Sequence, residues 1–220
     1  MSKPDLPAGA FHGHIGRTFA ESEPWFEEPV HPADDSPNVV IVLLDDTGFA
    51  QLGCYGSEID TPHIDELAAS GLQFTNFHVT PLCSPTRASL LTGRSQHAVG
   101  MRAVSNFQTG FPHQLGHISN HAATVAEVLQ AEGYATFCAG KWHLAPMEQC
   151  SAAGPFEQWP LGRGFDRFYG FLEGETDQFH PQLVCDNHPI DPPGKAEDGY
   201  HLSEDLVDQL LRMVSDSKGV

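Results

Sequence analysis

The sequence has little positive charge. Lysine and arginine together number 11, aspartate and glutamate number 29, and the formal net charge of the 220-residue chain is -18 at pH 7. So acidic a chain repels phosphate backbones and anionic lipid surfaces, and we therefore expect neither nucleic acid nor a membrane as a partner. An anionic substrate would need positive charge that is concentrated at one place in the fold.

Paired cysteines and long apolar runs are also missing. The five cysteines are scattered along the chain: Cys54, Cys83, Cys138, Cys150 and Cys185. None forms a Cys-x-x-Cys pair, which argues against a disulfide framework or a thiolate zinc site, and the histidines show no HExxH spacing. The sequence contains no run of about 18 apolar residues, so it predicts no membrane span. The N-terminus, MSKPDLPAGAFHGHIG, lacks a secretion signal, so we expect a cytoplasmic protein.

The first 36 residues differ from the rest in composition. Residues 1–36 are rich in proline, glycine, glutamate and aspartate and have little periodicity. We interpret them as an extended arm that lies over the domain, with disorder as the alternative. The expected anchors of the arm are Phe11, Ile15, Trp25 and Phe26. Residues 37–220 are expected to form one domain.

Strand and helix patterns alternate after residue 37. The continuous apolar run NVVIVLLDD, residues 38–46, predicts a strand that is buried on both faces, as in a parallel sheet. LQFTNFHV, residues 72–79, and YATFCA, residues 134–139, predict two more strands. The alternation predicts an α/β fold with a mostly parallel central sheet flanked by helices. Residues 145–199, dense in proline, glycine and aromatics, are expected to form long loops.

Two helices are predicted before residue 100. In TPHIDELAASG, residues 61–71, Thr61 has the character of an N-cap, proline follows at the first helical position, and Gly71 is a typical stop. The second helix is predicted over residues 84–93, with Ser84 as its cap. Its expected core-facing residues are Leu90 and Leu91.

Two further helices are predicted in the second half of the chain. The segment ATVAEVLQAEG, residues 123–133, should place one apolar face against the core: Val125, Val128 and Leu129. The last helix is predicted over about residues 202–215 and has an apolar stripe made by Leu202, Leu206, Leu210 and Leu211.

Two adjacent carboxylates, Asp45 and Asp46, follow the first predicted strand. Neighbouring carboxylates repel each other, and a hard cation such as Ca²⁺ or Mg²⁺ would offset that repulsion. The alternative is that they form a turn and cap the next segment. In parallel sheets, sites form beyond the carboxyl ends of strands, where this pair and the later GKWH segment both lie.

The GKWH segment carries two further candidates. Lys141 and His143 are two residues apart, so an extended backbone points them the same way. Together they could hold an anion and protonate a leaving group. The alternative is a surface lysine beside an amphipathic tryptophan, Trp142.

The segment CSPTR, residues 83–87, places a cysteine just before a predicted helix. Unpaired N–H groups and the positive dipole end make this position suitable for an anion. Arg87, about one turn further on, adds a fixed charge and a donor fork. The alternative is that Cys83 is a small buried residue that only packs before a capped helix.

The longer stretch CSPTRASLLTGR resembles the signature of the type I sulfatases, the formylglycine-dependent arylsulfatases of the alkaline-phosphatase superfamily. VLLDDTGFAQLGCYG, TPHIDELAASGLQFTNFHV, GYATFCAGKWHL and GFDRFYGF resemble other segments of that family, in the family's order. The opening FHGHIGRTFAESEPWFEEP is similar to the beginning of long actinobacterial-type arylsulfatases. The resemblance implies a sulfatase-like fold that is incomplete in this chain.

The resemblance also implies a set of site residues. The cysteine of C-x-P-x-R would be oxidised to formylglycine by a formylglycine-generating enzyme, which is thus an implied partner during maturation. The implied metal ligands, for Ca²⁺ in preference to Mg²⁺, are Asp45, Asp46 and the modified Cys83. The implied catalytic residues are Cys83, Arg87, Lys141 and His143. Arg87 would steady the formylglycine hydrate, and Lys141 and His143 would contact the sulfate group and the hydrate.

Several parts of the family pattern have no match in this sequence. A later Asp-Asn pair, a histidine and a lysine are absent, and Asp186–Asn187 lies too early to be that pair. Two aspartates do not complete a calcium site, which takes about 6–8 oxygens. Residues 37–220 are therefore expected to be the N-terminal part of a sulfatase catalytic domain.

The expected activity is hydrolysis of sulfate monoesters, with a small-molecule sulfate ester as substrate. Two alternatives stay open: a phosphonate or phosphate ester hydrolase of the same superfamily, and an inactive truncated chain.

Overall fold

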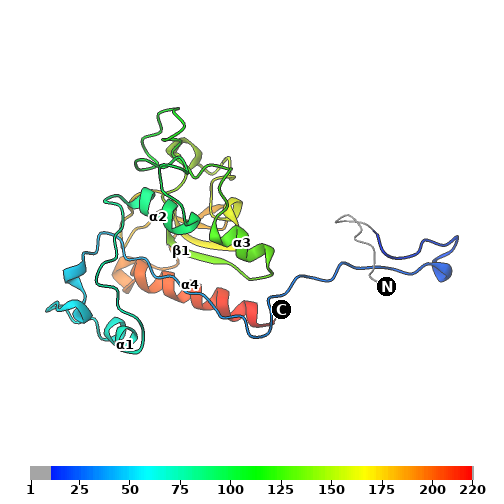
Figure 1. Cartoon of the computed structure of the whole chain (residues 1–220), viewed down its shortest axis with the longest axis horizontal. Coiled ribbons are helices and arrows are strands. Elements are labelled where there is room, and N and C mark those ends of the chain that lie inside the picture. The colour runs from blue at the N-terminus through cyan, green and yellow to red at the C-terminus, as the bar shows by residue number, and fades with distance from the viewer. Residues whose placement is uncertain (1–10, 220) are drawn as a thin grey trace.

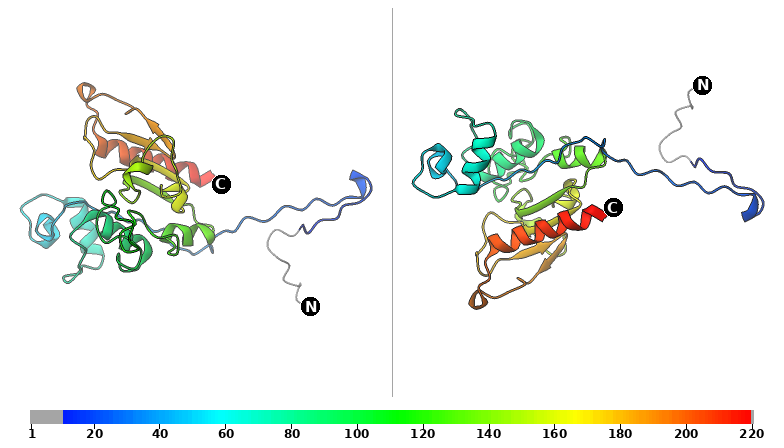
Figure 2. Two further views of the ribbon diagram at one scale, coloured as in Figure 1. Left: turned by 90° about the horizontal axis from the view of Figure 1, so that it is seen from above. Right: turned by 90° about the horizontal axis from the view of Figure 1, so that it is seen from below.

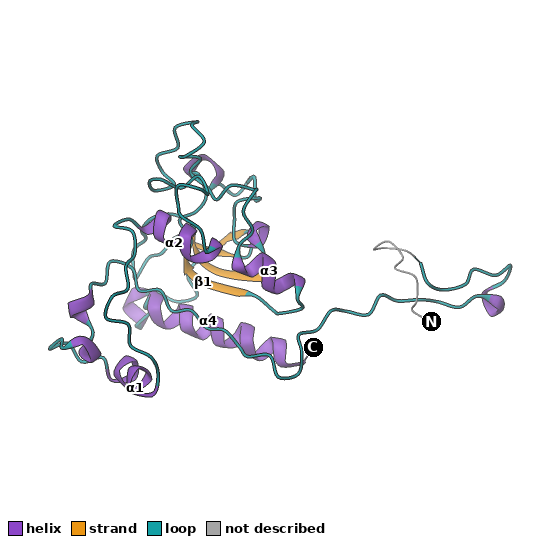
Figure 3. Ribbon diagram, viewed as in Figure 1, coloured by secondary structure: helices purple, strands orange, loops and turns teal. Residues whose placement is uncertain are grey.

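A four-stranded sheet forms the centre of the computed structural model, which describes residues 11–219 (Figures 1 and 3). Its strands are β1 (Phe137–Lys141), β2 (Arg167–Phe171), β3 (Leu183–Cys185) and β4 (His188–Ile190). They lie in the order β1-β2-β3-β4, with β1 and β2 parallel and the other two pairings antiparallel. The α/β class is thus confirmed, and the sheet in the described residues is mixed.

Helices cover both faces of this sheet. The four α-helices of residues 11–219 are α1 (Pro62–Ser70), which lies away from the sheet, α2 (Cys83–Thr92), α3 (Val125–Ala131) and α4 (Leu202–Asp216). Figure 2 shows α4 on one side of the sheet and α2 and α3 on the other. None of the helices in the described part of the chain has both the length and the apolar character needed to cross a membrane.

Alternation along β2 separates two apolar cores. Phe168 points into the core that contains Ala88 of α2, whereas the next residue, Tyr169, belongs to the cluster with Leu202 and Met213 of α4. Successive side chains of a strand point to opposite faces, which accounts for this division. The sheet thereby fixes α2 relative to the end of β1, where the GKWH segment emerges.

The pairing of β1 with β2 continues past the end of β1. Lys141 is the last β1 residue and lies opposite Phe171. Beyond it, Trp142 N donates to Phe171 O at 2.9 Å and His143 N donates to Leu172 O at 3.0 Å. The backbone after β1 is thus held in place, as a site at a strand end requires.

Two predicted strands do not form ladders among residues 11–219. The run 38–46 contains no strand, and its apolar side chains are exposed, with Val40 at 79% and Val42 at 76%. Residues 72–79 are likewise outside any strand, and Phe77 is 72% exposed. A strand that is buried on both faces needs neighbouring strands and covering helices, and the exposed side chains show that these segments lack such cover within the described residues.

The region predicted as long loops contains β2, β3 and β4. The strands β3 and β4 are only three residues long each, and Asp186 in the turn between them has φ 54. Pro189 lies within β4, which is an edge strand, where a missing N–H is tolerated. Such short strands rich in turn residues give almost no periodic signal. The strand predicted over 134–139 is present, but it begins at Phe137 and ends at Lys141.

The four predicted helices are present, but some of their N-cap residues and buried side chains differ from the prediction. The cap of α2 is Leu82 rather than Ser84, because the helix already begins at Cys83, and Gly93 ends it at φ 63. Leu90 is 39% exposed, whereas Ala88 is fully buried. In α1, Thr61 is the N-cap residue as predicted, but its side chain makes no cap hydrogen bond.

The predicted apolar face of α3 is wrong. Val125 and Val128 are exposed, whereas Ala126 is buried, because the backbone at Gly164 packs closely against the start of the helix. In α4, Leu202 and Met213 are buried but Leu211 is 62% exposed. Leu211 lies about 100° around the helix from Leu210, which takes it off the apolar stripe.

The N-terminal arm extends away from the sheet instead of lying over it (Figure 1). Three of its predicted anchors, Phe11, Ile15 and Phe26, are 50%, 80% and 82% exposed. Trp25 packs only within the arm, with its ring centroid 4.7 Å from that of His12. Residues 1–10 lie outside the described part of the chain. All five cysteines are free, as their spacing predicted.

Candidate functional site

The start of α2 brings Cys83 to the end of β1. Cys83 Sγ lies 3.1 Å from His143 Nδ1, although the two residues are 60 positions apart. The neighbouring Ser84 makes the connection between the two segments, because its hydroxyl donates to His143 O at 2.7 Å and accepts from Ser105 N at 3.1 Å. His143 has a left-handed backbone, at φ 53, which this buried hydroxyl helps to hold.

A cluster of ion pairs lies beside this cysteine–histidine pair. Asp45 Oδ2 is 2.6 Å from Lys141 Nζ and 3.1 Å from Arg87 Nη2. Arg87 also reaches the β1 backbone, where Nη1 donates to Lys141 O at 2.5 Å. Burial alone would raise the pKa of Asp45, but the hydrogen bond and charge of Lys141, together with Arg87, outweigh it and hold the pKa below its usual value.

His143 is held in its neutral form. Its pKa is lowered to about 4, chiefly by burial and further by the positive charges of Lys141 and Arg87, while Asp45 opposes the shift. At neutral pH one ring nitrogen therefore carries a proton and the other carries a lone pair. The site thus places a potential proton acceptor against residue 83 and two cations nearby.

The structure gathers five of the six predicted site residues through direct contacts. Cys83 pairs with His143, and Asp45 joins Arg87 and Lys141. Asp46 follows Asp45 in a turn and has φ 53, a conformation in keeping with the turn alternative. No contact recorded within residues 11–219 joins Asp46 to the cluster.

The described residues do not make a complete metal site. No group of three or more His, Cys, Asp or Glu side chains within residues 11–219 is arranged to hold an ion. Both cationic partners of Asp45, Lys141 and Arg87, contact the same carboxylate oxygen, Oδ2. Since Ca²⁺ takes about 6–8 oxygen ligands, the ligand set Asp45, Asp46 and Cys83 stays a prediction.

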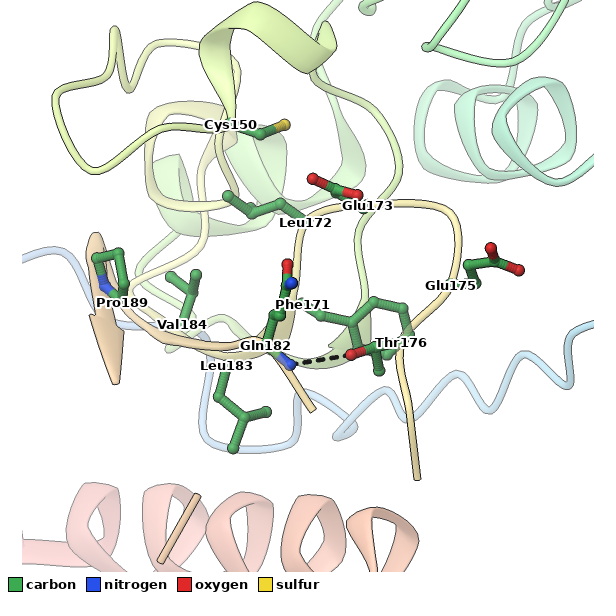
Figure 4. A pocket seen from close by; sticks show the side chains of 10 residues that line it. All are labelled: Cys150, Phe171, Leu172, Glu173, Glu175, Thr176, Gln182, Leu183, Val184 and Pro189. Carbon is green, nitrogen blue, oxygen red and sulfur yellow. Dashed lines mark hydrogen bonds between the residues drawn. The ribbon is translucent and has the colours of Figure 1, made fainter. Parts of the chain in front are cut away.

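A small cavity of ≈ 110 Å³ lies beside the loop that follows β2 (Figure 4). Its walls are the side chains labelled in Figure 4, among them Phe171, Glu173 and Val184, and they include none of the predicted site residues. The loop itself packs on His143: a side chain at Gly174 would come within 2.8 Å of ring atom Cε1. Glycine at this position therefore lets the loop close against the imidazole.

Sequence reasoning missed several residues of this site. Ser84 was expected to cap a helix, and Asn106, whose Oδ1 lies 2.5 Å from His143 Nε2, had no predicted role. Gly174 also gave no motif signal. These residues act through contacts between segments far apart in the sequence, which local patterns do not encode.

The sequence of this chain was compared with protein families and with known proteins. The family model described as "Sulfatase" matches residues 37–219. The chain belongs to the sulfatase family. It is 42% identical over 165 residues to human arylsulfatase A, an alignment that covers 74% of this chain and 30% of that protein. It is 41% identical over 145 residues to mouse steryl-sulfatase, covering 64% of this chain and 23% of that protein.

A solved structure shares the architecture. The crystal structure of Ps i-CgsB superposes with a TM-score of 0.65 and 27% sequence identity over 79% of this chain and 40% of that chain. The sulfatase chain described here spans 34%, 30% and 23% of the length of three curated relatives that it matches. The resemblance inferred from CSPTRASLLTGR and the accompanying segments is thus confirmed at the level of the family.

Proposed function

We propose that this sulfatase-family chain serves the hydrolysis of sulfate monoesters, of arylsulfatase type, through a formylglycine made from Cys83. The observation that carries the proposal is the contact of 3.1 Å between Cys83 Sγ and His143 Nδ1, beside the cations Arg87 and Lys141. A neutral imidazole can take a proton from residue 83, and the adjacent cations suit an anionic group that is bound there.

The modified residue would supply the nucleophile. The hydrate of formylglycine carries two hydroxyls on one carbon. One attacks sulfur and displaces the alcohol or phenol of the ester, which leaves with a proton. Deprotonation of the other hydroxyl then breaks the C–O bond to the sulfate group, so that sulfate leaves and the aldehyde is regenerated. The contact of His143 Nδ1 with Cys83 Sγ supports a role for this nitrogen as acceptor of the proton at residue 83. Arg87 and Lys141 would stabilise negative charge on the sulfate oxygens, and a plain thiol or serine hydroxyl could not regenerate itself in this way.

The ion cluster also answers how so acidic a chain could bind an anion. The chain has a net charge of -18, but Arg87 and Lys141 share a single acidic partner, Asp45. Their side chains are only 13% and 12% exposed, so bulk water screens their charge less than it would at a free surface. Locally, positive charge is therefore in excess at the place where the substrate would bind.

Calcium is the metal that we propose for the site, with Asp45 and Asp46 among its ligands. Ca²⁺ would supply positive charge near the reacting group. The described residues provide only part of the required oxygens, so the roles assigned above to His143, Arg87 and Lys141 do not depend on the ion.

The experiment is a pair of rate measurements on the protein produced together with a formylglycine-generating enzyme. We expect faster turnover of 4-nitrophenyl sulfate than of a matched aryl phosphonate. Lys141→Met should reduce the sulfate rate strongly, whereas Lys195→Met, at an exposed lysine, should not. Faster phosphonate turnover would favour the phosphonate hydrolase alternative and contradict this proposal.

A further inference from the structure

Both ring nitrogens of His143 have a side-chain neighbour. Nδ1 faces Cys83 Sγ at 3.1 Å, and Nε2 faces Asn106 Oδ1 at 2.5 Å. A neutral imidazole has one N–H donor and one lone pair, so the partner of one nitrogen decides what the other can do. The chemical character of Asn106 therefore matters for the nitrogen that faces residue 83.

The second contact of Asn106 fixes which way its amide points. Asn106 Nδ2 lies 3.1 Å from Met147 Sδ. A thioether sulfur can accept a hydrogen bond but cannot donate one, so the NH₂ group belongs on the Met147 side. The carbonyl oxygen Oδ1 is then left to face His143, and an amide oxygen can only accept.

From this geometry we propose that Asn106 is a positioning residue, which keeps the proton of His143 on Nε2 and leaves the lone pair of Nδ1 aimed at residue 83. The inference deepens the proposed function, and the catalytic use of that lone pair rests on the proposed function. The assignment of the hydrogen bond between Asn106 and His143 does not depend on it. Partners of a histidine's second nitrogen set the tautomer and the ring orientation in this manner.

The backbone around Asn106 is anchored to the same site. Ser105 N donates to the buried hydroxyl of Ser84, which in turn donates to His143 O. Phe107 N donates to Val104 O at 3.1 Å and closes the turn. Asn106 is thus presented to His143 by a turn that is tied to the backbone of that same histidine.

The position also suits a substitution experiment. Asn106 is exposed, whereas its partner His143 is 5% exposed, so a change at 106 removes the contact without opening the core. Gly174 packs against the imidazole ring, closest to Cε1, and Ser84 holds the backbone of His143, and both contacts remain in the variants. A matched control exists in Asn120, an exposed asparagine that pairs with Gln158 instead.

The test is the ¹⁵N spectrum of His143 at neutral pH in the unmodified full chain, with Asn106→Leu, Asn106→Asp and Asn120→Leu variants. We expect pyrrole-type Nε2 and pyridine-type Nδ1 in the parent protein. A single hydrogen bond is worth a factor of about three to ten, so Asn106→Leu should lower the Nε2–H to Nδ1–H ratio by about that factor. Asn106→Asp retains an acceptor and should preserve the parent tautomer, as should Asn120→Leu.

Three results would overturn the inference: a parent spectrum with pyrrole-type Nδ1, an unchanged spectrum in Asn106→Leu, or loss of the tautomer in Asn106→Asp. The first would mean that the amide donates to Nε2 instead of accepting from it. In the matured enzyme, Asn106→Leu should lower kcat about three- to tenfold with KM unchanged. Absence of any sulfatase turnover in the parent would contradict the proposed function, whereas the spectra test the role of Asn106 separately.

Discussion

Replacing Ser84 by alanine should destabilise the protein more than a one-atom change suggests. The Ser84 side chain is fully buried between α2, the segment after β1 and the turn at residue 105. Its hydroxyl satisfies two backbone groups at once, the carbonyl of His143 at 2.7 Å and the N–H of Ser105 at 3.1 Å. Alanine would leave both groups buried without a partner.

The size of the effect follows from these two contacts. A buried polar group that loses its partner costs about 1–3 kcal/mol, so two such groups cost about 2–6 kcal/mol. Alanine has a better helix propensity than serine, which returns up to about 0.5 kcal/mol. We therefore expect Ser84→Ala to lower the free energy of unfolding by about 1.5–5.5 kcal/mol, a large part of a typical domain stability of about 5–15 kcal/mol.

The assay is urea unfolding followed by tryptophan fluorescence, with Ser89→Ala as the matched control. Ser89 is on the same helix, but its hydroxyl makes only one long contact, 3.5 Å to Gln96 Oε1. The control shares the gain in helix propensity and should stay within about 0.5 kcal/mol of the parent. Equal midpoints and slopes for Ser84→Ala and Ser89→Ala would refute the reasoning.

Three further predictions concern stability. Arg163→Met should lower the free energy of unfolding by about 2–5 kcal/mol in urea titrations, because two buried carbonyls that accept from this guanidinium at 2.8 Å lose their donor. Tyr169→Phe should cost about 1–2 kcal/mol by the same measurement, since Tyr169 donates to buried Asp205 at 2.7 Å while Tyr200 continues to do so. The pKa of His143 is about 4 in the folded protein against 6.5 when unfolded, so the unfolded state binds the extra proton first. The contribution of neutral His143 to the free energy of unfolding is fully present above pH 6.5. It is lost as the pH falls toward 4, by at most about 3 kcal/mol. In a pH series of urea titrations, the free energy of unfolding should therefore fall less steeply between pH 6.5 and 4 for His143→Gln than for the parent protein. Parallel curves for the two proteins would contradict the burial of a neutral imidazole.

Much of the candidate site could be predicted because its residues sit at the ends of regular elements. Cys83 begins a helix that has strong start and stop signals, and Lys141 ends a strand with clear β-propensity. Sites form at such ends in α/β folds, so the two motifs could be assigned to one site before their contact was known. In the structure, Cys83 Sγ lies 3.1 Å from His143 Nδ1, so the two segments meet.

The parts that sequence reasoning missed depend on packing between distant segments. The run 38–46 has the composition of a buried strand, but burial depends on cover from other segments, and within the described residues its apolar side chains are exposed. The hydroxyl of Ser84 could serve either a helix cap or a tertiary contact, and the contact with His143 prevails. Asn106 is a single polar residue in an irregular loop and therefore has no periodic signal at all.

The mass of the peptide that contains residue 83 tests the central claim most directly. The protein should be isolated from cells that contain a formylglycine-generating enzyme, and the peptide analysed without alkylation and again after it. Conversion of Cys83 to formylglycine lowers the peptide mass by about 18 Da and removes the thiol, and we predict that form for the active protein. Active protein whose peptide retains an unmodified, alkylatable cysteine at position 83 would contradict it.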